Sequence, residues 1–331
     1  MNTDRRFLRF RSLAALSFFA AFCLSANANI TINPTFDSSI TNDPNAATIE
    51  AGIDQAISRL ESSIENPISV SIDFQEVSSG LGASSTILNQ IPYSQYRSEL
   101  ANNQILSAND TTALASLPMT STNPVNGNAN VLLTVANLRA LQGGSPSGFD
   151  STISLNTSIM NLSRTGPQNP NFFDLQAIAS HEIDQALGIG GSGSMIGNAS
   201  LGFPTGPVGS MDLFRYSGNG VRSYTTSTSA TAYFSIDGGK TNLTNFNQAG
   251  GGSDYGDWLG GSTPQVQDAF GTPGVNINLG VNELTALDVV GYNLVAVPEP
   301  GSGVLLVGGL IAIGILRCRR KVSEQRVWAL R

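Results

Sequence analysis

Apolar and polar residues alternate along the chain in patterns that predict a few helices and strands. Apolar residues recur at helical spacing over Ala47–Ile64, which predicts an amphipathic helix. The segments Ile68–Phe74 and Ser151–Ile159 alternate with period two, which predicts strands. Segments 93–103 and 107–117 are typical of short helices. Helices and strands therefore mix along the chain from its first half onward.

The most clearly delimited helix lies near the middle, over Asn171–Leu187. Asn171 is a suitable N-cap, and Asp174 stands three residues further on, in the capping-box position. Gly188 begins a glycine-rich stretch, which ends helices because glycine favours their C-caps. This helix carries the motif discussed below.

The remaining segments give weaker patterns. Periodicity does not decide between helix and strand for the apolar run in Asn130–Gln142. Segments 222–228 and 231–242 are β-like, and Asn282–Leu294 predicts a last helix with Gly291 as its C-cap. The order of elements indicates an α+β fold with a loop-rich C-terminal half.

The first 28 residues have the three parts of a secretory signal peptide. Four arginines precede the apolar run Leu13–Leu24, which is too short for a membrane-spanning helix. Ala26-Asn27-Ala28 then provides the small residues that a signal peptidase needs. We expect export with cleavage after residue 28; an uncleaved N-terminal anchor is the alternative.

The C-terminal end, 297–331, has a second apolar segment. Val297-Pro298-Glu299-Pro300 precedes the 16-residue apolar run 301–316, which is short against the about 20 residues of a bilayer span. The basic residues after it favour a cytoplasmic tail, because Lys and Arg stay on that side; they are Arg317, Arg319, Arg320 and Lys321. Residues 29–296 would then form one domain outside the cytoplasm.

This tripartite end resembles the PEP-CTERM sorting signal of bacteria that produce exopolysaccharide. The resemblance rests on Pro298-Glu299-Pro300, the short apolar run and the arginine cluster, all together at the C-terminus. It implies a transient inner-membrane anchor, cleavage by an exosortase, and release to the cell surface or extracellular matrix. A plain C-terminal membrane anchor is the alternative.

Charge excludes some partners for residues 29–296. This region has seven basic and 21 acidic residues, a net charge of −14. Nucleic acids and anionic lipids need basic patches, so we expect neither as a partner. Both cysteines, Cys23 and Cys318, lie in the two ends, so no disulfide stabilises the domain and no thiolate can bind a metal there.

The stretch Ser180–Ser194, SHEIDQALGIGGSGS, contains part of a zinc-protease motif. In HExxH enzymes two histidines at i and i+4 bind zinc and the glutamate at i+1 activates water. Here His181 and Glu182 match, but Gln185 replaces the second histidine. Its amide oxygen is a weaker zinc ligand than imidazole.

The chain has a single histidine, so oxygen donors must complete any metal site. Helical spacing places Asp184 near the face of His181 and Gln185, and Asp212 could return from a later loop. Gly191 stands where an extended motif has its third histidine. One imidazole with oxygens is compatible with zinc, and equally with manganese or calcium. A lone His-Glu pair without a catalytic role is the alternative.

The stretches around the motif resemble a family of bacterial exported proteins classed as metalloproteases, which often carry a PEP-CTERM tail. The resemblance covers Phe173–Asn293 and, more loosely, Ile49–Phe74; it includes FDLQAIASHEIDQALGIG, SDYGDWL and LTALDVVGYN. It implies a zincin-like fold in which the motif helix packs on a mixed sheet. It also implies His181 as ligand and Glu182 as general base, with Gln185 at a position that is acidic in other members.

Other candidate chemistry is sparse. Asp254 and Asp257 in SDYGDW could bind calcium, although a plain turn is the simpler interpretation. The only histidine lies beside Glu182, so no Ser-His-Asp triad is credible, and the glycine-rich segments lack phosphate-binding spacing.

Two functional hypotheses follow. The first is an exported metallohydrolase, a peptidase in the simplest case, in which His181, Gln185, Asp184 and Asp212 are candidate ligands of a divalent metal and Glu182 polarises water. The second is a catalytically inactive zincin-like surface or matrix protein that binds polysaccharide or partners; the missing histidines favour it.

Overall fold

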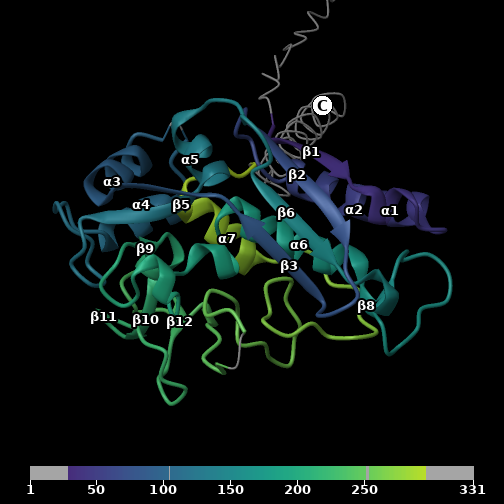
Figure 1. The fold of residues 1–331 in the computed structure, drawn as a ribbon. Coiled ribbons are helices and arrows are strands. Elements are labelled where there is room, and N and C mark those ends of the chain that lie inside the picture. Colours follow the sequence, from purple (N-terminus) through teal and green to yellow (C-terminus); the bar gives the residue numbers. More distant parts are fainter. Residues whose placement is uncertain (1–28, 104, 251–252, 296–331) are drawn as a thin grey trace, which may run out of the picture.

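The computed structural model describes residues 29–103, 105–250 and 253–295. Within these ranges the chain has an α+β fold with seven α-helices and several small sheets, as the sequence pattern predicts (Figure 1). The predicted signal peptide (1–28) and sorting signal (297–331) lie outside the described residues. None of the helices within the described ranges is long and apolar enough to cross a membrane.

A four-stranded mixed sheet carries much of the core. Its order is β1-β2-β6-β3, in which the first three strands are parallel and β3 pairs antiparallel with β6 at the edge. The bounds are β1 Thr31–Phe36, β2 Ser69–Glu76, β3 Gly82–Thr86 and β6 Ser151–Leu155. Val70, Ile72 and Phe74 on β2 are fully buried, as the alternation predicts. The sequence pattern does not predict β1 or β3.

Helices α2 (Ala46–Glu61) and α6 (Leu175–Leu187) contact each other and this sheet (Figure 1). They approach closely at Gly52, because a Cβ there would lie 2.7 Å from Leu175 Cδ2. Helix α6 also contacts the edge strand β3 and its neighbour β6. The motif helix is therefore fixed against the open edge of the sheet.

Helix α6 begins later than the sequence predicts, with Asp174 as N-cap instead of Asn171. Asp174 accepts a hydrogen bond from the Gln176 N–H at 3.3 Å and pairs with Arg164. Its own segment, β8 (Phe173–Asp174), is extended because it pairs with β7 (Met160–Asn161). Gly188 ends the helix with φ +101°, as predicted.

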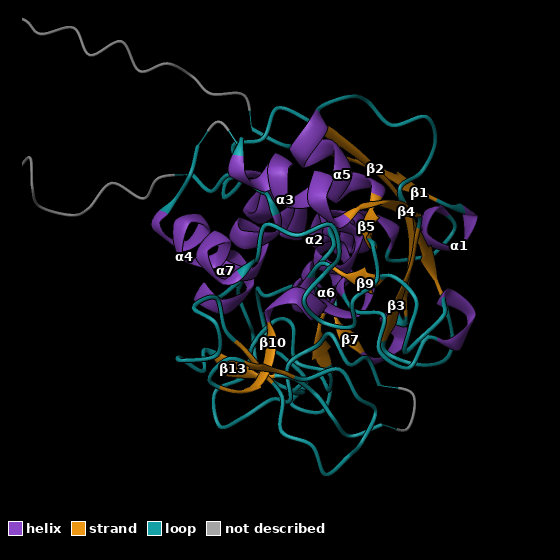
Figure 2. Ribbon diagram, turned by 90° about the vertical axis from the view of Figure 1, so that its left-hand side faces the viewer, coloured by secondary structure: helices purple, strands orange, loops and turns teal. Residues whose placement is uncertain are grey.

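A second sheet and most of the other helices lie beside the first layer (Figure 2). The sheet consists of β4 Leu88–Pro92, β5 Asn130–Thr134 and β9 Val208–Gly209. The other helices are α1 Ser38–Thr41, α3 Tyr93–Ala101, α4 Ala108–Ser116, α5 Val135–Gln142 and α7 Val281–Val290. The segment 130–142 thus divides into strand and helix at Thr134, whose hydroxyl accepts from the Asn137 N–H at 3.1 Å.

Between α6 and α7 the described chain is rich in loops, as predicted. Its remaining strands have two to four residues: β10 Arg215–Gly218, β11 Val221–Arg222, β12 Tyr233–Phe234 and β13 Thr244–Asn245. The β-like segments 222–228 and 231–242 are mostly outside strands, which corrects the prediction. Trp258, buried and stacked on Phe234 with centroids 5.5 Å apart, gives this region a core. Helix α7 ends at Gly291, its predicted C-cap.

Two buried carboxyl groups lie near each other where α4 packs on α7. Ser107 bridges them: its N–H donates to Asp110 Oδ2 (2.9 Å) and its hydroxyl donates to Asp288 Oδ2 (2.8 Å). Burial raises the pKa of Asp110 to about 6, and the charge of Asp288 adds to the rise, whereas the Ser107 hydrogen bonds oppose it. This contact therefore stabilises the fold less as Asp110 ionises.

The substitution Asp110→Asn tests this contact. The pKa of Asp110 in the fold is above its unfolded value of about 3.9, so the native state binds the proton more tightly, and stability falls as pH rises from about 4 to about 6. The variant keeps an oxygen that can accept from Ser107. We expect it to be more stable than wild type at pH 8, by about 1 kcal/mol after solvent screening, and equally stable near pH 4. Thermal unfolding at both pH values checks this, with the exposed Asp54→Asn as control; an offset independent of pH would contradict it.

Candidate functional site

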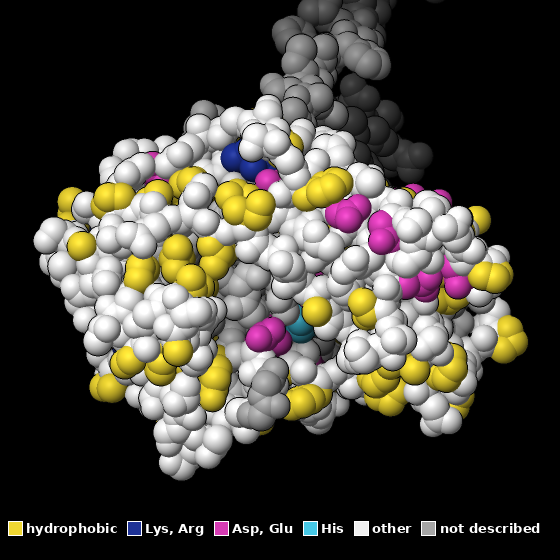
Figure 3. Space-filling model, viewed as in Figure 1, with side chains coloured by type: hydrophobic (Ala, Val, Ile, Leu, Met, Phe, Trp, Pro, Cys, Tyr) yellow, Lys and Arg dark blue, Asp and Glu magenta, His cyan; other side chains and the backbone are white. Residues whose placement is uncertain are grey.

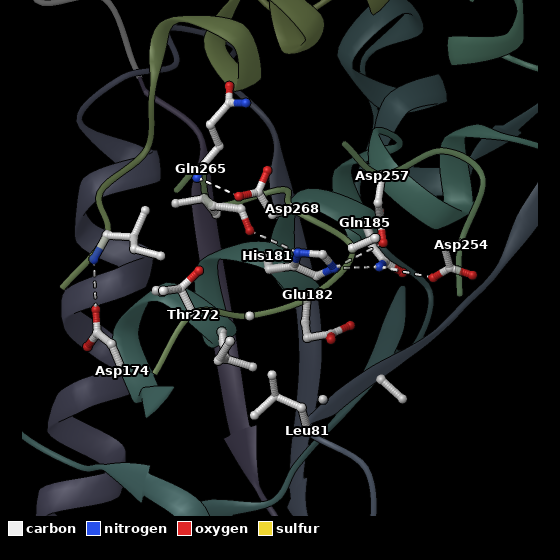
Figure 4. Close-up of a pocket in the computed structure, with 18 of the residues that line it drawn as sticks. Leu81, Asp174, His181, Glu182, Gln185, Asp254, Asp257, Gln265, Asp268 and Thr272 are labelled. Carbon is white, nitrogen blue, oxygen red and sulfur yellow. Dashed lines mark hydrogen bonds and ion pairs between the residues drawn. The ribbon is translucent and has the colours of Figure 1, made fainter. Parts of the chain in front are cut away.

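The motif residues of α6 face a cavity of about 420 Å³. Residues of α6, of β3 and of the loops around 253–257 and 265–277 line it. Figure 3 shows the chain's one histidine in a hollow of the surface with an acidic side chain beside it. Figure 4 shows that His181, Glu182, Gln185, Asp254 and Asp257 lie close together there.

His181 is held by one hydrogen bond that fixes its tautomer. Its Nδ1 lies 2.9 Å from the carbonyl oxygen of Val266, which can only accept, so Nδ1 carries the proton. In the neutral ring Nε2 is therefore the atom with the lone pair. Burial lowers the pKa of His181, but the negative charges of Asp257 and Glu182 outweigh it and raise that pKa to about 9.

Two amides and one carboxylate surround this Nε2 atom. Gln185 Nε2 lies 3.0 Å from it, Gln267 Nε2 3.4 Å and Asp257 Oδ2 3.6 Å. Gln267 also donates to Asp257 Oδ1 at 2.8 Å. His181 Nε2 thus faces a compact polar cluster, and the Asp257 carboxylate forms an ion pair with the imidazole ring when the ring is protonated.

Glu182 follows on the helix and is buried more deeply. Only 4 % of it is exposed, and its Oε2 has no hydrogen-bond partner among the described residues. Burial raises the pKa of Glu182 to about 7, with the charge of His181 opposing the rise. A carboxyl group with this pKa can both accept and return a proton near neutral pH.

Gln185 lies in the cavity beside His181, as its i+4 spacing predicts. Its Oε1 accepts a hydrogen bond from the Ser84 hydroxyl at 2.7 Å, and its Nε2 points toward Asp254 Oδ2 at 3.4 Å as well as toward His181. The amide nitrogen therefore faces the imidazole, and the oxygen faces strand β3.

Asp184 and Asp212, the other two candidate ligands from the sequence, are not among the residues that line the cavity. Residues i+3 and i+4 are about 100° apart around a helix, so Gln185 faces the cavity while Asp184 turns away. Asp184 is fully buried, and burial and the charge of Glu283 on α7 raise its pKa well above the usual range. Neither of its carboxylate oxygens has a hydrogen-bond partner among the described residues.

Asp212 is placed by a different set of contacts. Its oxygens accept from the Ser194 hydroxyl (2.6 Å), the Met195 N–H (2.9 Å) and the Gly209 N–H (2.8 Å). These bonds join the turn after α6 to β9. Asp212 therefore organises the backbone behind the cavity, and its oxygens are occupied.

Asp254 and Asp257, for which the sequence favoured a plain turn, flank a turn at 255–256 and also line the cavity. The reason is space at two glycines: a Cβ at Gly191 would overlap Asp254 Oδ2, and one at Gly190 would overlap Gln267 and lie 2.9 Å from Asp257 Oδ1. Gly191 is the position of the missing third histidine, so the acidic loop fills the room that this side chain would take. In the sequence, the spacing of these two aspartates, three residues apart, was the only feature that pointed to a role for them in the site.

No group of three or more His, Cys, Asp or Glu side chains in the described ranges is arranged to hold a metal ion as it stands. The donors at Nε2 nevertheless suit a cation. Two ligands of one ion, each about 2.1 Å from it, are about 3.4 Å apart, close to the 3.6 Å between His181 Nε2 and Asp257 Oδ2. Two side-chain oxygens of the residues near His181 are buried and have no hydrogen-bond partner among the described residues: Glu182 Oε2 and Gln267 Oε1. In the structure Asp257 supplies the oxygen nearest to His181 Nε2 among these contacts, since Gln185 and Gln267 both direct their amide nitrogens toward it.

Comparisons with known proteins add nothing to this geometry: no family model, no curated protein and no solved structure matches the chain.

The contact of β3 with Glu182 gives a prediction that needs no assumed activity. A Cβ at Gly82 would lie 2.5 Å from Glu182 Oε1 and 3.0 Å from Ile178 Cγ2. We expect Gly82→Ala to displace the Glu182 carboxyl group and to destabilise the fold by about 1–2 kcal/mol, because the buried neighbours have little room to move. Denaturant unfolding measures this. Gly148→Ala is the matched control, since nothing lies within 4 Å of a Cβ there; equal stability of the two variants would contradict the prediction.

Proposed function

We propose that the protein is an exported metallohydrolase, in the simplest case a metal-dependent peptidase with a zincin-like arrangement. The observation that carries the proposal is the cavity itself, where His181 Nε2, a buried Glu182 carboxyl group and Asp257 lie together. Metal-dependent hydrolysis needs a ligand set, a carboxylate base beside it and space for a substrate. The cavity has candidate groups for the first two and a volume of about 420 Å³ for the third.

His181 Nε2 and Asp257 Oδ2 would hold the ion, and the side-chain amides of Gln185 and Gln267 would complete its shell. Turning the Gln185 amide over would direct its oxygen toward the ion. Asp254, which Gln185 contacts at 3.4 Å, supplies further negative charge nearby. A shell with one nitrogen and several oxygens suits manganese or calcium as well as zinc. When bound, a divalent ion supplies Lewis-acid polarisation of the substrate carbonyl group.

Glu182 would act as general base and acid. Its pKa of about 7 lets it take a proton from water and then give that proton to the leaving amine. Gly82 leaves room for this carboxyl group, because a Cβ there would lie 2.5 Å from Glu182 Oε1. Glu182 Oε2 has no hydrogen-bond partner among the described residues, which supports a catalytic use of the residue, since this oxygen is free to accept a proton.

Strand β3 would bind a peptide substrate. It is the edge strand of its sheet, and Gly82, Ala83 and Ser84 line the cavity. An extended peptide can add to such an edge through main-chain hydrogen bonds. A mixed sheet, an antiparallel edge strand and a motif helix packed against it support the zincin-like comparison.

The two ends of the sequence support an exported location. We propose that signal peptidase removes residues 1–28 and that an exosortase-type enzyme acts near Pro298-Glu299-Pro300, so that the protein passes from a transient inner-membrane anchor (301–316) to the cell surface or matrix.

One contact favours the alternative, an inactive zincin-like surface or matrix protein that binds polysaccharide or partners. The Gln185 amide nitrogen lies 3.0 Å from His181 Nε2, and in the neutral ring it donates to the lone pair that a metal would need. A protein that never binds metal would keep this hydrogen bond. Metal content separates the two functions.

The metal prediction concerns the purified protein prepared without chelator. We expect about one divalent ion per chain by elemental analysis. His181→Ala and Asp257→Asn should each lower the affinity at least tenfold, because each removes a ligand. The exposed Asp54→Asn should not change it. A wild-type protein essentially free of divalent ions, even after incubation with zinc, manganese or calcium, would refute metal binding.

The catalytic prediction concerns Glu182→Gln. This substitution keeps the shape of the side chain but removes the base, so we expect hydrolysis of casein to fall by about 10²- to 10⁴-fold while the metal content is unchanged. Casein turnover and elemental analysis on the same sample measure both. Turnover that is absent from wild type, or equal in the variant, would support the inactive binding protein instead.

A further inference from the structure

The charges around the cavity are strongly unbalanced. Five carboxylates line it, together with one histidine: Asp174, Glu182, Asp254, Asp257 and Asp268. No lysine or arginine is among the described residues that line it. A cleft lined by one sign of charge concentrates ligands of the other sign.

Two of these acids are compensated within the protein. Arg164 donates to both oxygens of Asp174, and Asp257 lies beside His181. Asp268, in contrast, has no cationic partner in an ion pair within the described ranges. Its exposed fraction is 7 %, its Oδ2 accepts only the Gln265 N–H at 2.9 Å, and its Oδ1 has no partner there. A buried carboxylate is costly unless a cation approaches it.

Apolar side chains line the same cavity. Ala177 and Ile178 contribute from α6, and Val275 and Ile277 from the loop that also carries Asp268. Figure 4 shows Asp268 beside the His181 ring, across it from Asp254. An apolar wall next to a carboxylate without an ion-pair partner among the described residues matches a side chain with an aliphatic stem and a cationic head.

We propose that this cavity selects peptides with a lysine or arginine side chain. The aliphatic stem of that side chain would lie on the apolar wall, and its cationic group would pair with the Asp268 carboxylate. This inference rests on the proposed function, because it names the substrate of that site. A divalent ion at His181 and Asp257 would leave the charges of Asp254 and Asp268 in place. The preference would therefore persist in the metal-bound protein.

The test measures binding, so that it does not depend on turnover. The Glu182→Gln protein is titrated into a dye-labelled peptide, acetyl-Ala-Ala-Lys-Leu-Ala-Ala, and into the same peptide with Nε-acetyl-lysine, with fluorescence anisotropy as the readout. Acetylation removes the charge and keeps the stem. We expect the Kd to rise about tenfold on acetylation, the size of one charged hydrogen bond.

Asp268→Asn in the same background should reduce this ratio to about one, and Asp54→Asn should leave it unchanged. Equal Kd values for the two peptides, or binding of neither, overturn the inference. The comparison of the two peptides needs no substitution at Asp268, so it decides the matter even if that variant fails to fold. A protein that binds metal and hydrolyses casein without charge preference loses only the substrate inference. One that prefers lysine but holds no metal loses only the proposed function.

Discussion

The geometry of the cavity depends on the hydrogen bond from His181 Nδ1 to the Val266 carbonyl oxygen. It joins helix α6 to a loop 85 residues further along the chain and fixes both the ring and its tautomer. Because Nδ1 is occupied, Nε2 is the atom that meets Gln185, Gln267 and Asp257. Without this bond the imidazole could rotate, and Asp257 and Gln267 would no longer lie near one nitrogen atom.

The buried carboxyl groups of the described residues fall into two sets, those with an arginine partner and those without one. Asp150 and Asp174 are paired with Arg139 and Arg164, the usual solution for a buried carboxylate in a stable fold. Glu182 and Asp268 are also buried, with 4 % and 7 % exposed, but neither has an arginine partner within the described ranges. Burial raises the pKa of both, to about 7 and about 6. Carboxyl groups with raised pKa values and no arginine partner cluster at functional sites, because catalysis needs groups whose pKa is shifted toward the working pH.

How much the sequence predicts depends on how local each feature is. Helix α2, strand β2 and helix α6 follow from their own periodicity, and His181, Glu182 and Gln185 follow from spacing on one helix. Strand β3 could not be predicted in this way, because GASST has no apolar alternation. The glycine at its start is explained by the buried Glu182, whose Oε1 would lie 2.5 Å from a Cβ at Gly82. Asp257 and Gln267 reach His181 through tertiary packing, which no local pattern records.

Where a residue departs from a motif, the room that its side chain leaves free is as informative as its chemical type. Gly190 and Gly191 remove side chains from the turn after α6, and Gly256 lets the acidic loop approach so closely that a Cβ there would overlap the Gly190 carbonyl oxygen. The two backbones meet only because both carry glycine at the contact. Gly190 and Gly191 thus admit Asp254 and Asp257 to the cavity, so that carboxyl groups and no second imidazole lie near His181 among the described residues. Carboxylate oxygens favour harder cations than imidazole nitrogens do.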